Sequence, residues 1–136
     1  MTIMRYLTEP GDVILDPMSG TGTTMLATIE DRSVVLIEIE EEYHLMQQQV
    51  RERLTEIYPP ASNNILLLFG DCRKFLPMPA DAIIFSPQYA GMMKRKEDDI
   101  LEFEDGSKRI LPDFSKDPWN LANLSRFMYF QVMEKI

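Results

Sequence analysis

Residues 13–24 combine an acidic side chain with two glycines, a pairing that suits the binding of a small molecule. Residues 13–15, Val-Ile-Leu, favour a buried strand, and the next nine, Asp-Pro-Met-Ser-Gly-Thr-Gly-Thr-Thr, make a turn that can open a helix. Glycine lets the backbone come close to a ligand, and the start of a helix offers unpaired N–H groups. We therefore expect a cradle of nucleotide size, built by Asp16, Pro17, Met18, Ser19, Gly20, Gly22 and Thr23.

Two phosphate-binding loops do not fit this turn. A P-loop needs Gly-Lys-Ser/Thr, and no lysine precedes Lys74. A dinucleotide fingerprint needs a third glycine, and this chain has Met25 in that place. Asp16 would repel a phosphate, but it could neutralise a positively charged group of a ligand. The turn therefore predicts a nucleoside without phosphates, and one that can carry an amine.

Strands and helices alternate along the chain in a way that would position this turn. The apolar run 34–37 favours a strand covered on both faces, as in a parallel sheet between helix layers. We expect an α/β fold with a mostly parallel sheet flanked by helices, whose ligands bind at the carboxyl edge. The expected strands are 13–15, 33–39, 65–69 and 81–85, and the expected helices are 2–8, 23–31, 40–58 and a last one that follows residues 118–120 and runs to 136.

The spacing of apolar residues predicts which side of each helix is buried. In the helix 23–31 the inward residues are Met25, Leu26 and Ile29. In the helix 40–58 they are Leu45, Val50, Leu54 and Ile57. In the last helix they are Leu121, Leu124, Phe127, Met128 and Val132, and we also expect Trp119 in the core.

Polar residues stand where the second and third strands end. Glu38 follows Gly20 by 18 positions, close to the roughly 20-residue spacing at which a strand-end carboxylate meets a ribose hydroxyl; the alternative is a solvated charge. Asp71 could accept a hydrogen bond from an adenine amino group, and the Cys72 N–H could reach a ring nitrogen. The Cys72 thiol has no activating base nearby in the sequence, and His44 lacks partners for a metal.

The turn at residues 16–24 resembles the cofactor loop of class I S-adenosylmethionine-dependent methyltransferases. It is most similar to the amino-group methyltransferases of DNA, which make N6-methyladenine or N4-methylcytosine. The resemblance implies a Rossmann-like fold, S-adenosylmethionine as cofactor and double-stranded DNA as partner. In this family an acid in the place of Glu38 holds the ribose, and an acidic run and a tyrosine follow, here Tyr43. The implied cofactor contacts are the turn residues together with Glu38, Ile39, Asp71 and Cys72.

Residues 86–89, Ser-Pro-Gln-Tyr, resemble the catalytic motif of the same family, which is Asp, Asn or Ser, then Pro-Pro, then an aromatic residue. The Ser86 hydroxyl and the Pro87 carbonyl could accept hydrogen bonds from an exocyclic amine and aim its lone pair at the methyl group. Tyr89 would stack on a base flipped out of the duplex. Gln88 departs from the second proline of the motif. The absence of a Pro-Cys pair here disfavours the covalent route to carbon-5 methylation.

Composition limits where the chain can work and what it can bind. The sequence has 136 residues, a formal net charge of −8 and one cysteine. The single cysteine suits the reducing cytoplasm, and we expect no membrane span. The negative charge is unfavourable for DNA, so either the basic face is local or the part that grips DNA is not in this chain. Residues 92–96, Met-Met-Lys-Arg-Lys, are the one basic cluster, within a predicted loop 90–118; a solvated loop is the equal alternative.

The resemblance implies a larger sheet than the four strands predicted here. We therefore expect residues 1–136 to form a single partial catalytic domain, truncated after the fourth strand. Its open edge could be completed by a second copy or by a partner chain. We expect weak or no activity from this chain alone. The alternatives are an RNA guanine-N2 methyltransferase and a cofactor-binding protein without catalysis.

Overall fold

The computed structural model describes residues 2–87, 100–102, 108–110 and 117–134. Its internal contacts divide the chain into two compact units, one over residues 1–87 and one over residues 88–135. The first unit contains the glycine turn and the strand ends that the sequence singled out.

The first unit is built on a parallel sheet of four strands in the order β3-β2-β1-β4. The strands are β1 (Val13–Asp16), β2 (Ser33–Glu38), β3 (Ile65–Phe69) and β4 (Ala82–Ile83). The chain steps outward from β1 through β2 to β3, and then returns to pair β4 with the other side of β1. The predicted α/β fold with a mostly parallel sheet is confirmed. The reversal creates a topological switch point between β1 and β4.

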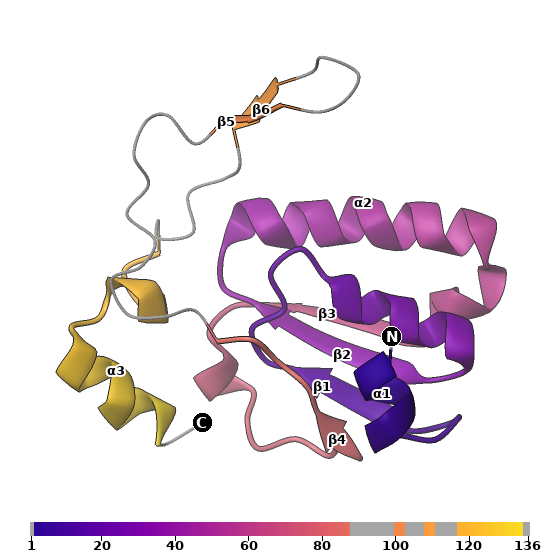
Figure 1. Ribbon diagram of the computed structural model, residues 1–136, viewed down its shortest axis with the longest axis horizontal. Coiled ribbons are helices and arrows are strands. Elements are labelled where there is room, and N and C mark those ends of the chain that lie inside the picture. The colour runs from indigo at the N-terminus through magenta and orange to yellow at the C-terminus, as the bar shows by residue number, and fades with distance from the viewer. Residues whose placement is uncertain (1, 88–99, 103–107, 111–116, 135–136) are drawn as a thin grey trace. The chain divides into compact units, whose positions relative to one another are not determined.

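Helical segments connect the strands, and the longest crosses one face of the sheet (Figure 1). The chain opens with α1 (Thr2–Leu7), and η1 (Thr23–Glu30) joins β1 to β2. The crossover from β2 to β3 runs through α2 (Glu41–Ile57) and the short 3₁₀ segment η2 (Pro59–Asn63). The prolines at the start of η2 end α2, as expected from their missing N–H groups. A further 3₁₀ turn, η3 (Cys72–Lys74), follows β3.

The two faces of the sheet are covered unequally. Side chains alternate along each strand, so neighbouring residues such as Ile14 and Leu15 enter different clusters. One cluster joins the strands to the helical layer through Ile14, Met25, Ala27, Val34, Leu36, Leu54, Ala61 and Ile65. The other has a buried centre of only Leu15, Ile37 and Cys72. The expectation of two covered faces therefore holds for β2, whereas Leu66 and Ile83 are exposed.

Two predicted helix faces are only partly confirmed: Met25 and Leu54 are buried as expected, but their predicted neighbours on the same faces are not. The segment 23–31 is a 3₁₀ helix, whose three-residue repeat buries Thr24 with Ala27 and Met25 with Thr28. Leu26 and Ile29, placed inward by an α-helical repeat, are exposed. In α2 the buried residues are Tyr43, Gln47 and Leu54, and the exposed ones include Leu45, Val50 and Ile57. The spacing of apolar residues mispredicted the buried face of α2 because a polar residue, Gln47, is buried near its middle.

The second unit contains short elements within its described residues. Strands β5 (Ile100–Glu102) and β6 (Lys108–Ile110) pair in antiparallel fashion inside the segment 90–118 that the sequence predicted as a loop. The predicted last helix is divided into η4 (Leu121–Asn123) and α3 (Arg126–Met133), capped by Asn120 and Ser125.

The apolar positions predicted for this last helix are only partly confirmed. Leu121 is buried as expected, and Tyr129, which was not selected, is also buried. Trp119, expected in the core, is 68% exposed, and Phe127 and Met128 are exposed as well. The break at Leu124 between η4 and α3 explains the difference, because a single helical repeat does not run through it.

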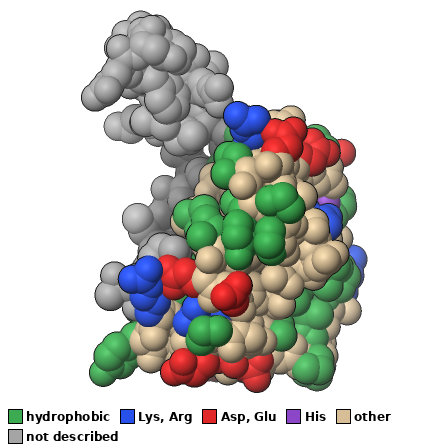
Figure 2. Space-filling view, turned by 90° about the vertical axis from the view of Figure 1, so that its right-hand side faces the viewer, with side chains coloured by type: hydrophobic (Ala, Val, Ile, Leu, Met, Phe, Trp, Pro, Cys, Tyr) green, Lys and Arg blue, Asp and Glu red, His purple; other side chains and the backbone are tan. Residues whose placement is uncertain are grey.

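The side of the first unit where α2 ends carries hydrophobic side chains beside acidic ones (Figure 2). Exposed apolar residues of α1 and of the ends of η1 and α2 include Ile3, Leu7, Ile29 and Ile57. None of the described helices combines the length and apolar character needed to cross a membrane.

Candidate functional site

The carboxyl ends of the parallel strands bring the predicted site residues to one edge of the sheet. Asp16 is the last residue of β1, Glu38 is the last of β2, and Asp71 follows β3 after one glycine. Ser86 lies three positions beyond β4. In open α/β sheets this edge, next to the switch point, is where ligands bind. The structure thus places the predicted strand-end residues at the edge where the sequence expected them.

The glycine turn is fastened to the end of β2 by backbone and side-chain hydrogen bonds. The Ser19 N–H and hydroxyl both donate to the Ile37 carbonyl, at 3.1 and 3.0 Å. The Gly22 N–H donates to the Ser19 carbonyl at 2.8 Å. Gly20 and Gly22 adopt φ values of +51° and +79°, in the left-handed region that favours glycine. The turn therefore has a defined shape before any ligand binds.

The two glycines serve different purposes. A Cβ on Gly22 would lie 2.4 Å from Met25 Cε and 3.0 Å from Gln47 Cγ, so a side chain there would force Met25 and Gln47 to shift, in a backbone conformation that already favours glycine. A Cβ on Gly20 would have no described atom within 4 Å. The sequence predicted close approach of a ligand at both glycines, but the open space lies at Gly20.

Asp16 is a buried carboxylate that belongs to the same turn. Its side chain accepts hydrogen bonds from the Thr24 hydroxyl and from the Met18 N–H, and the residue is 5% exposed. Burial raises the pKa of Asp16, although both hydrogen bonds oppose this. A cationic ligand group beside Asp16 would stabilise its charged form. This fits the predicted role of neutralising a positive charge.

Glu38 closes onto the turn through both carboxylate oxygens. Oε2 accepts from the Gly20 N–H at 2.7 Å, and Oε1 accepts from the Glu40 N–H at 2.9 Å. Glu38 is only 3% exposed, and burial raises its pKa to about 7 although backbone hydrogen bonds lower it. Glu38 is thus directed at the turn, and any ribose hydroxyl must share its oxygens or displace these N–H groups. Ile39, next in the chain, is half-buried.

Asp71 is engaged by a neighbour that the sequence analysis did not consider. Arg73 donates to Oδ1 from its backbone N–H (3.0 Å) and from Nε (2.8 Å). It donates to Oδ2 from Nε (2.9 Å) and from Nη2. These contacts come from three N–H groups, because the single Nε hydrogen is shared between the two oxygens, and they engage most of the carboxylate's about four lone-pair sites. The predicted adenine contact of Asp71 would therefore compete with Arg73.

The pKa values of Asp71 and Cys72 reflect the same local structure. Burial would raise the pKa of Asp71, but the hydrogen bonds and charge of Arg73 outweigh it and lower the pKa. The Cys72 thiol is buried against Leu15 and Ile37, and this burial, together with the Asp71 charge, raises its pKa. A protonated, buried thiol is a poor nucleophile.

The predicted catalytic motif is only partly within the described residues. Ser86 is exposed and Pro87 is half-buried. The strand that carries them is short, with two paired residues in β4 and a further hydrogen bond from the Ile84 N–H to the Leu15 carbonyl at 3.0 Å. Gln88 and Tyr89 lie outside the described residues, as does the basic cluster 92–96. Their roles remain predictions.

Gln47 is a site residue that the sequence analysis missed. Its Nε2 donates to the Ser19 hydroxyl at 2.9 Å and to the Gly20 carbonyl at 2.6 Å, across 27 or 28 positions of sequence. It is fully buried between α2 and the turn. Its position gave one hint. Gln47 follows Tyr43 by four residues, and residues i and i+4 lie on the same face of a helix, so the two side chains share the buried face of α2.

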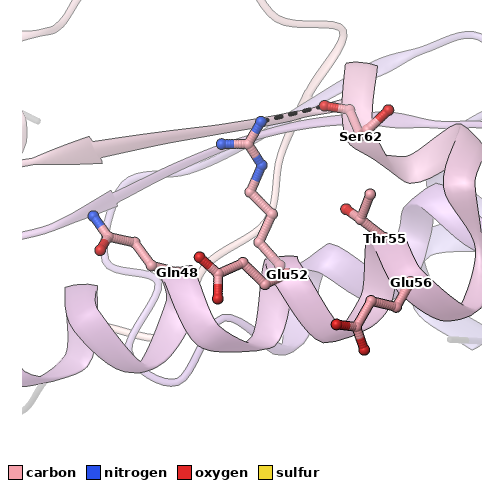
Figure 3. Close-up of a pocket in the computed structure, with 6 residues that line it drawn as sticks. Gln48, Glu52, Thr55, Glu56 and Ser62 are labelled. Atoms are coloured by element: carbon pink, nitrogen blue, oxygen red, sulfur yellow. Dashed lines mark hydrogen bonds between the residues drawn. The ribbon is translucent and has the colours of Figure 1, made fainter.

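A separate hollow of about 660 Å³ lies beside α2, away from the carboxyl edge. Its lining residues are Gln48, Arg51, Glu52, Thr55, Glu56 and Ser62. Figure 3 shows the polar side chains of α2 on one side of it and Ser62 on the other, and Arg51 Nη2 donates to the Ser62 carbonyl at 3.3 Å. Half of these residues are exposed and none is buried, so the hollow is a surface feature. Within the described residues there is also no group of three His, Cys, Asp or Glu that could hold a metal.

Comparisons with known proteins agree with this geometry. A family model described as DNA methylase matches residues 1–49, which contain the glycine turn and Glu38. A search of curated proteins found no match.

Solved structures share the fold at low sequence identity. One is a SAM-dependent methyltransferase from Thiobacillus denitrificans in complex with S-adenosyl-L-homocysteine. It is 18% identical, has a TM-score of 0.52, and the match covers 62% of this chain and 34% of that protein. A protein from Streptococcus mutans described as a methyltransferase, in complex with SAH, is 18% identical with a TM-score of 0.52, covering 68% and 52%. The Escherichia coli protein yhhF, also described as a methyltransferase, is 19% identical with a TM-score of 0.50, covering 68% and 53%.

The chain spans about half the length of these solved structures or less. Identities below one fifth establish the fold alone. The predicted resemblance is confirmed at the level of fold: the chain shares the fold of solved S-adenosylmethionine-dependent methyltransferases, and a family model described as DNA methylase matches residues 1–49.

Proposed function

We propose that the first unit binds S-adenosylmethionine at the carboxyl edge of its sheet. The observation that carries this proposal is the preformed turn at Gly20, which is open to a ligand and flanked by two buried carboxylates, Asp16 and Glu38. The cofactor fits these groups chemically. Its ribose has hydroxyl donors for Glu38, and its amino-acid end carries an ammonium group that suits Asp16.

We propose further that the bound cofactor serves methyl transfer to the exocyclic amino group of cytosine (N4) or adenine (N6) in DNA. S-adenosylmethionine supplies an electrophilic methyl group on a sulfonium. The match of residues 1–49 to the DNA methylases supports DNA as the substrate. The exposed Ser86 hydroxyl and the Pro87 carbonyl would accept hydrogen bonds from the amine and orient its lone pair. Gln88 and Tyr89 complete the proposed catalytic segment, with Tyr89 stacked on the flipped base.

Binding of DNA by a chain of net charge −8 needs a local basic surface. We propose the cluster 92–96, which follows the catalytic segment in sequence, as the contact to the phosphate backbone. The outer edge of β4 would pair with a second copy or a partner chain to complete the sheet.

A second candidate function is cofactor binding without catalysis. Gln88 in place of a proline favours it, because a residue with free φ holds the Pro87 carbonyl less rigidly. Two measurements separate the candidates: calorimetry with S-adenosyl-L-homocysteine, and transfer of a labelled methyl group to duplex DNA or RNA. We expect saturable binding, and weak or no transfer by this chain alone.

Each outcome of these measurements has a clear meaning. Transfer to DNA supports the proposed enzyme, and binding without any transfer, even with a catalytically complete partner chain added, supports the second candidate. Transfer to RNA but not to DNA would support the guanine-N2 alternative. Absence of binding would overturn all three.

A further inference from the structure

Gln47 is a buried polar residue that uses only one of its two amide atoms in hydrogen bonds to described residues. Its Nε2 makes two hydrogen bonds to the glycine turn, but Oε1 is buried and has no partner among the described residues. A buried acceptor left unpaired is costly, and an apolar side chain of the same length would avoid that cost. We therefore look for the role of Gln47 in its two hydrogen bonds to the glycine turn.

Gln47 and Glu38 hold Gly20 from its two sides. Glu38 accepts from the Gly20 N–H at 2.7 Å, and Gln47 donates to the Gly20 carbonyl at 2.6 Å. Gln47 also donates to the hydroxyl of Ser19, which in turn donates to the carbonyl of Ile37. A chain of hydrogen bonds thus runs from α2 through the turn to the end of β2.

A bound ligand would affect the hydrogen bonds of Glu38 and Gln47 to Gly20 differently. Glu38 lies where a ribose hydroxyl would bind, so the ligand competes with the Gly20 N–H for its oxygens. Gln47 approaches from α2 and is fully buried, so a ligand at the carboxyl edge does not compete with it. When Glu38 binds the ligand, the hydrogen bond from Gln47 to the Gly20 carbonyl remains.

We propose that Gln47 is a positioning residue that keeps the Gly20 turn in its binding shape while Glu38 exchanges backbone contacts for ligand hydroxyls. This inference rests on the proposed function, because it assigns a role in cofactor binding. It differs from a structural role in one measurable respect. Removing the amide should weaken ligand binding far more than it weakens the ligand-free fold, because the substitution also removes the unpaired Oε1.

The test compares Gln47→Met with Gln49→Met in the full chain. Methionine matches the length of glutamine without a donor, and Gln49 is an exposed residue of the same helix. With S-adenosyl-L-homocysteine as the probe, we expect Gln47→Met to bind about tenfold more weakly, the loss of about one hydrogen bond, while Gln49→Met binds like the wild type. We expect the thermal midpoints of the ligand-free proteins to stay close together, and amide exchange at Gly20 and Gly22 to accelerate only in Gln47→Met.

A second variant keeps the test decisive if Gln47→Met does not fold. The carboxyl introduced by Gln47→Glu has the same size, but it donates only when protonated. We expect its affinity relative to the wild type at the same pH to fall as the pH rises from 5 to 8, which a purely steric role would not produce. Equal affinity of the wild type and the Gln47 variants would overturn the inference alone. A wild type that does not bind would overturn the proposed function, and the role of Gln47 with it.

Discussion

The glycine turn and the end of β4 lie at the same edge of one sheet, but they are built very differently. The turn is fixed by hydrogen bonds from Ser19, Gln47 and Glu38, and its acidic groups are buried. The end of β4 has two paired residues and an exposed Ser86. The half of the site that would hold a cofactor is therefore preorganised, whereas the half that would hold the reacting amine has few contacts within the described residues.

This difference has a physical consequence for function. A preformed binding site needs little ordering when its ligand arrives, so its affinity can be high even where the rest of the site is less ordered. Methyl transfer is more demanding, because it needs the amine within a narrow range of distance and direction. We therefore expect changes around the turn to alter binding strongly, and changes at Ser86 to leave binding almost unaltered.

The largest expected effect follows from Glu38→Gln. The carboxamide loses the negative charge and directs an N–H group at one of the two backbone donors, Gly20 N–H or Glu40 N–H. Hydrogen bonds to charged groups are the stronger ones, so we expect about a hundredfold weaker binding of S-adenosyl-L-homocysteine by calorimetry. Glu41→Gln, at an exposed acid in the first turn of α2, is the matched control. Similar affinities of the two variants would contradict the role of Glu38.

The pH dependence of stability should reveal the same carboxylate. The folded-state pKa of Glu38 is raised from 4.5 to about 7, so the folded protein binds this proton more tightly than the unfolded chain does. The contribution of Glu38 is then fully present below pH 4.5 and is lost as the pH rises to about 7. We expect this loss to approach roughly 3 kcal/mol in the free energy of unfolding, measured by urea titration.

Glu38→Gln should flatten this profile between pH 4.5 and 7. Asp16, whose pKa is also raised, contributes with the same sign. Asp71 and Glu30 have lowered pKa values, so their contributions are lost only as the pH falls below about 4. A profile of the variant that is as steep as that of the wild type would show that Glu38 is not responsible.

Substitutions at Gly20 and Gly22 should have effects of intermediate size on stability. Gly22→Ala would force a methyl group against Met25 and Gln47 in a backbone conformation that alanine avoids, so we expect about 2–3 kcal/mol of lost stability in urea. Gly20→Ala meets the same backbone restriction without a described neighbour within 4 Å, and we expect about 1 kcal/mol. The order should reverse for ligand binding in proteins that remain folded, since the open space lies at Gly20. Equal losses of stability would mean that the packing at Gly22 is unimportant.

The smallest expected effect is that of Ser86→Ala on cofactor binding. Ser86 is exposed and follows a two-residue strand, so its hydroxyl contributes little to the preformed turn. We expect the affinity for S-adenosyl-L-homocysteine to change by less than about twofold, well below the effect of one hydrogen bond. A tenfold loss of affinity would indicate that the two halves of the site are coupled.

The sheet was predictable because its strands carry strong local signals. Continuous apolar runs at 34–37 and 65–69 correctly predicted two strands of a parallel sheet and the edge at which the site residues lie. The fourth strand is shorter than expected, with residues 82–83 in place of 81–85, although the Asp81 and Ile84 N–H groups also donate to carbonyls of β1. Parallel order itself follows from the alternation of strands and helical segments.

The details of the site were not predictable in the same way. Thr24 and Gln47 are polar residues that are buried because their partners, Asp16 and Gly20, come from another segment. Similarly, Asp71 pairs with Arg73 because the fold places the Arg73 guanidinium beside its carboxylate, and residue types alone do not predict that placement. Sequence patterns identified the groups at the edge, but the contacts among them required three-dimensional structure.

The proposed cofactor site is tested by a calorimetric titration of S-adenosyl-L-homocysteine into the full chain and into its Glu38→Gln and Glu41→Gln variants. We expect saturable binding of one ligand per chain, strongly weakened by Glu38→Gln and retained by Glu41→Gln. No binding by the wild type, or equal binding by all three proteins, would contradict a cofactor site at Gly20 and Glu38.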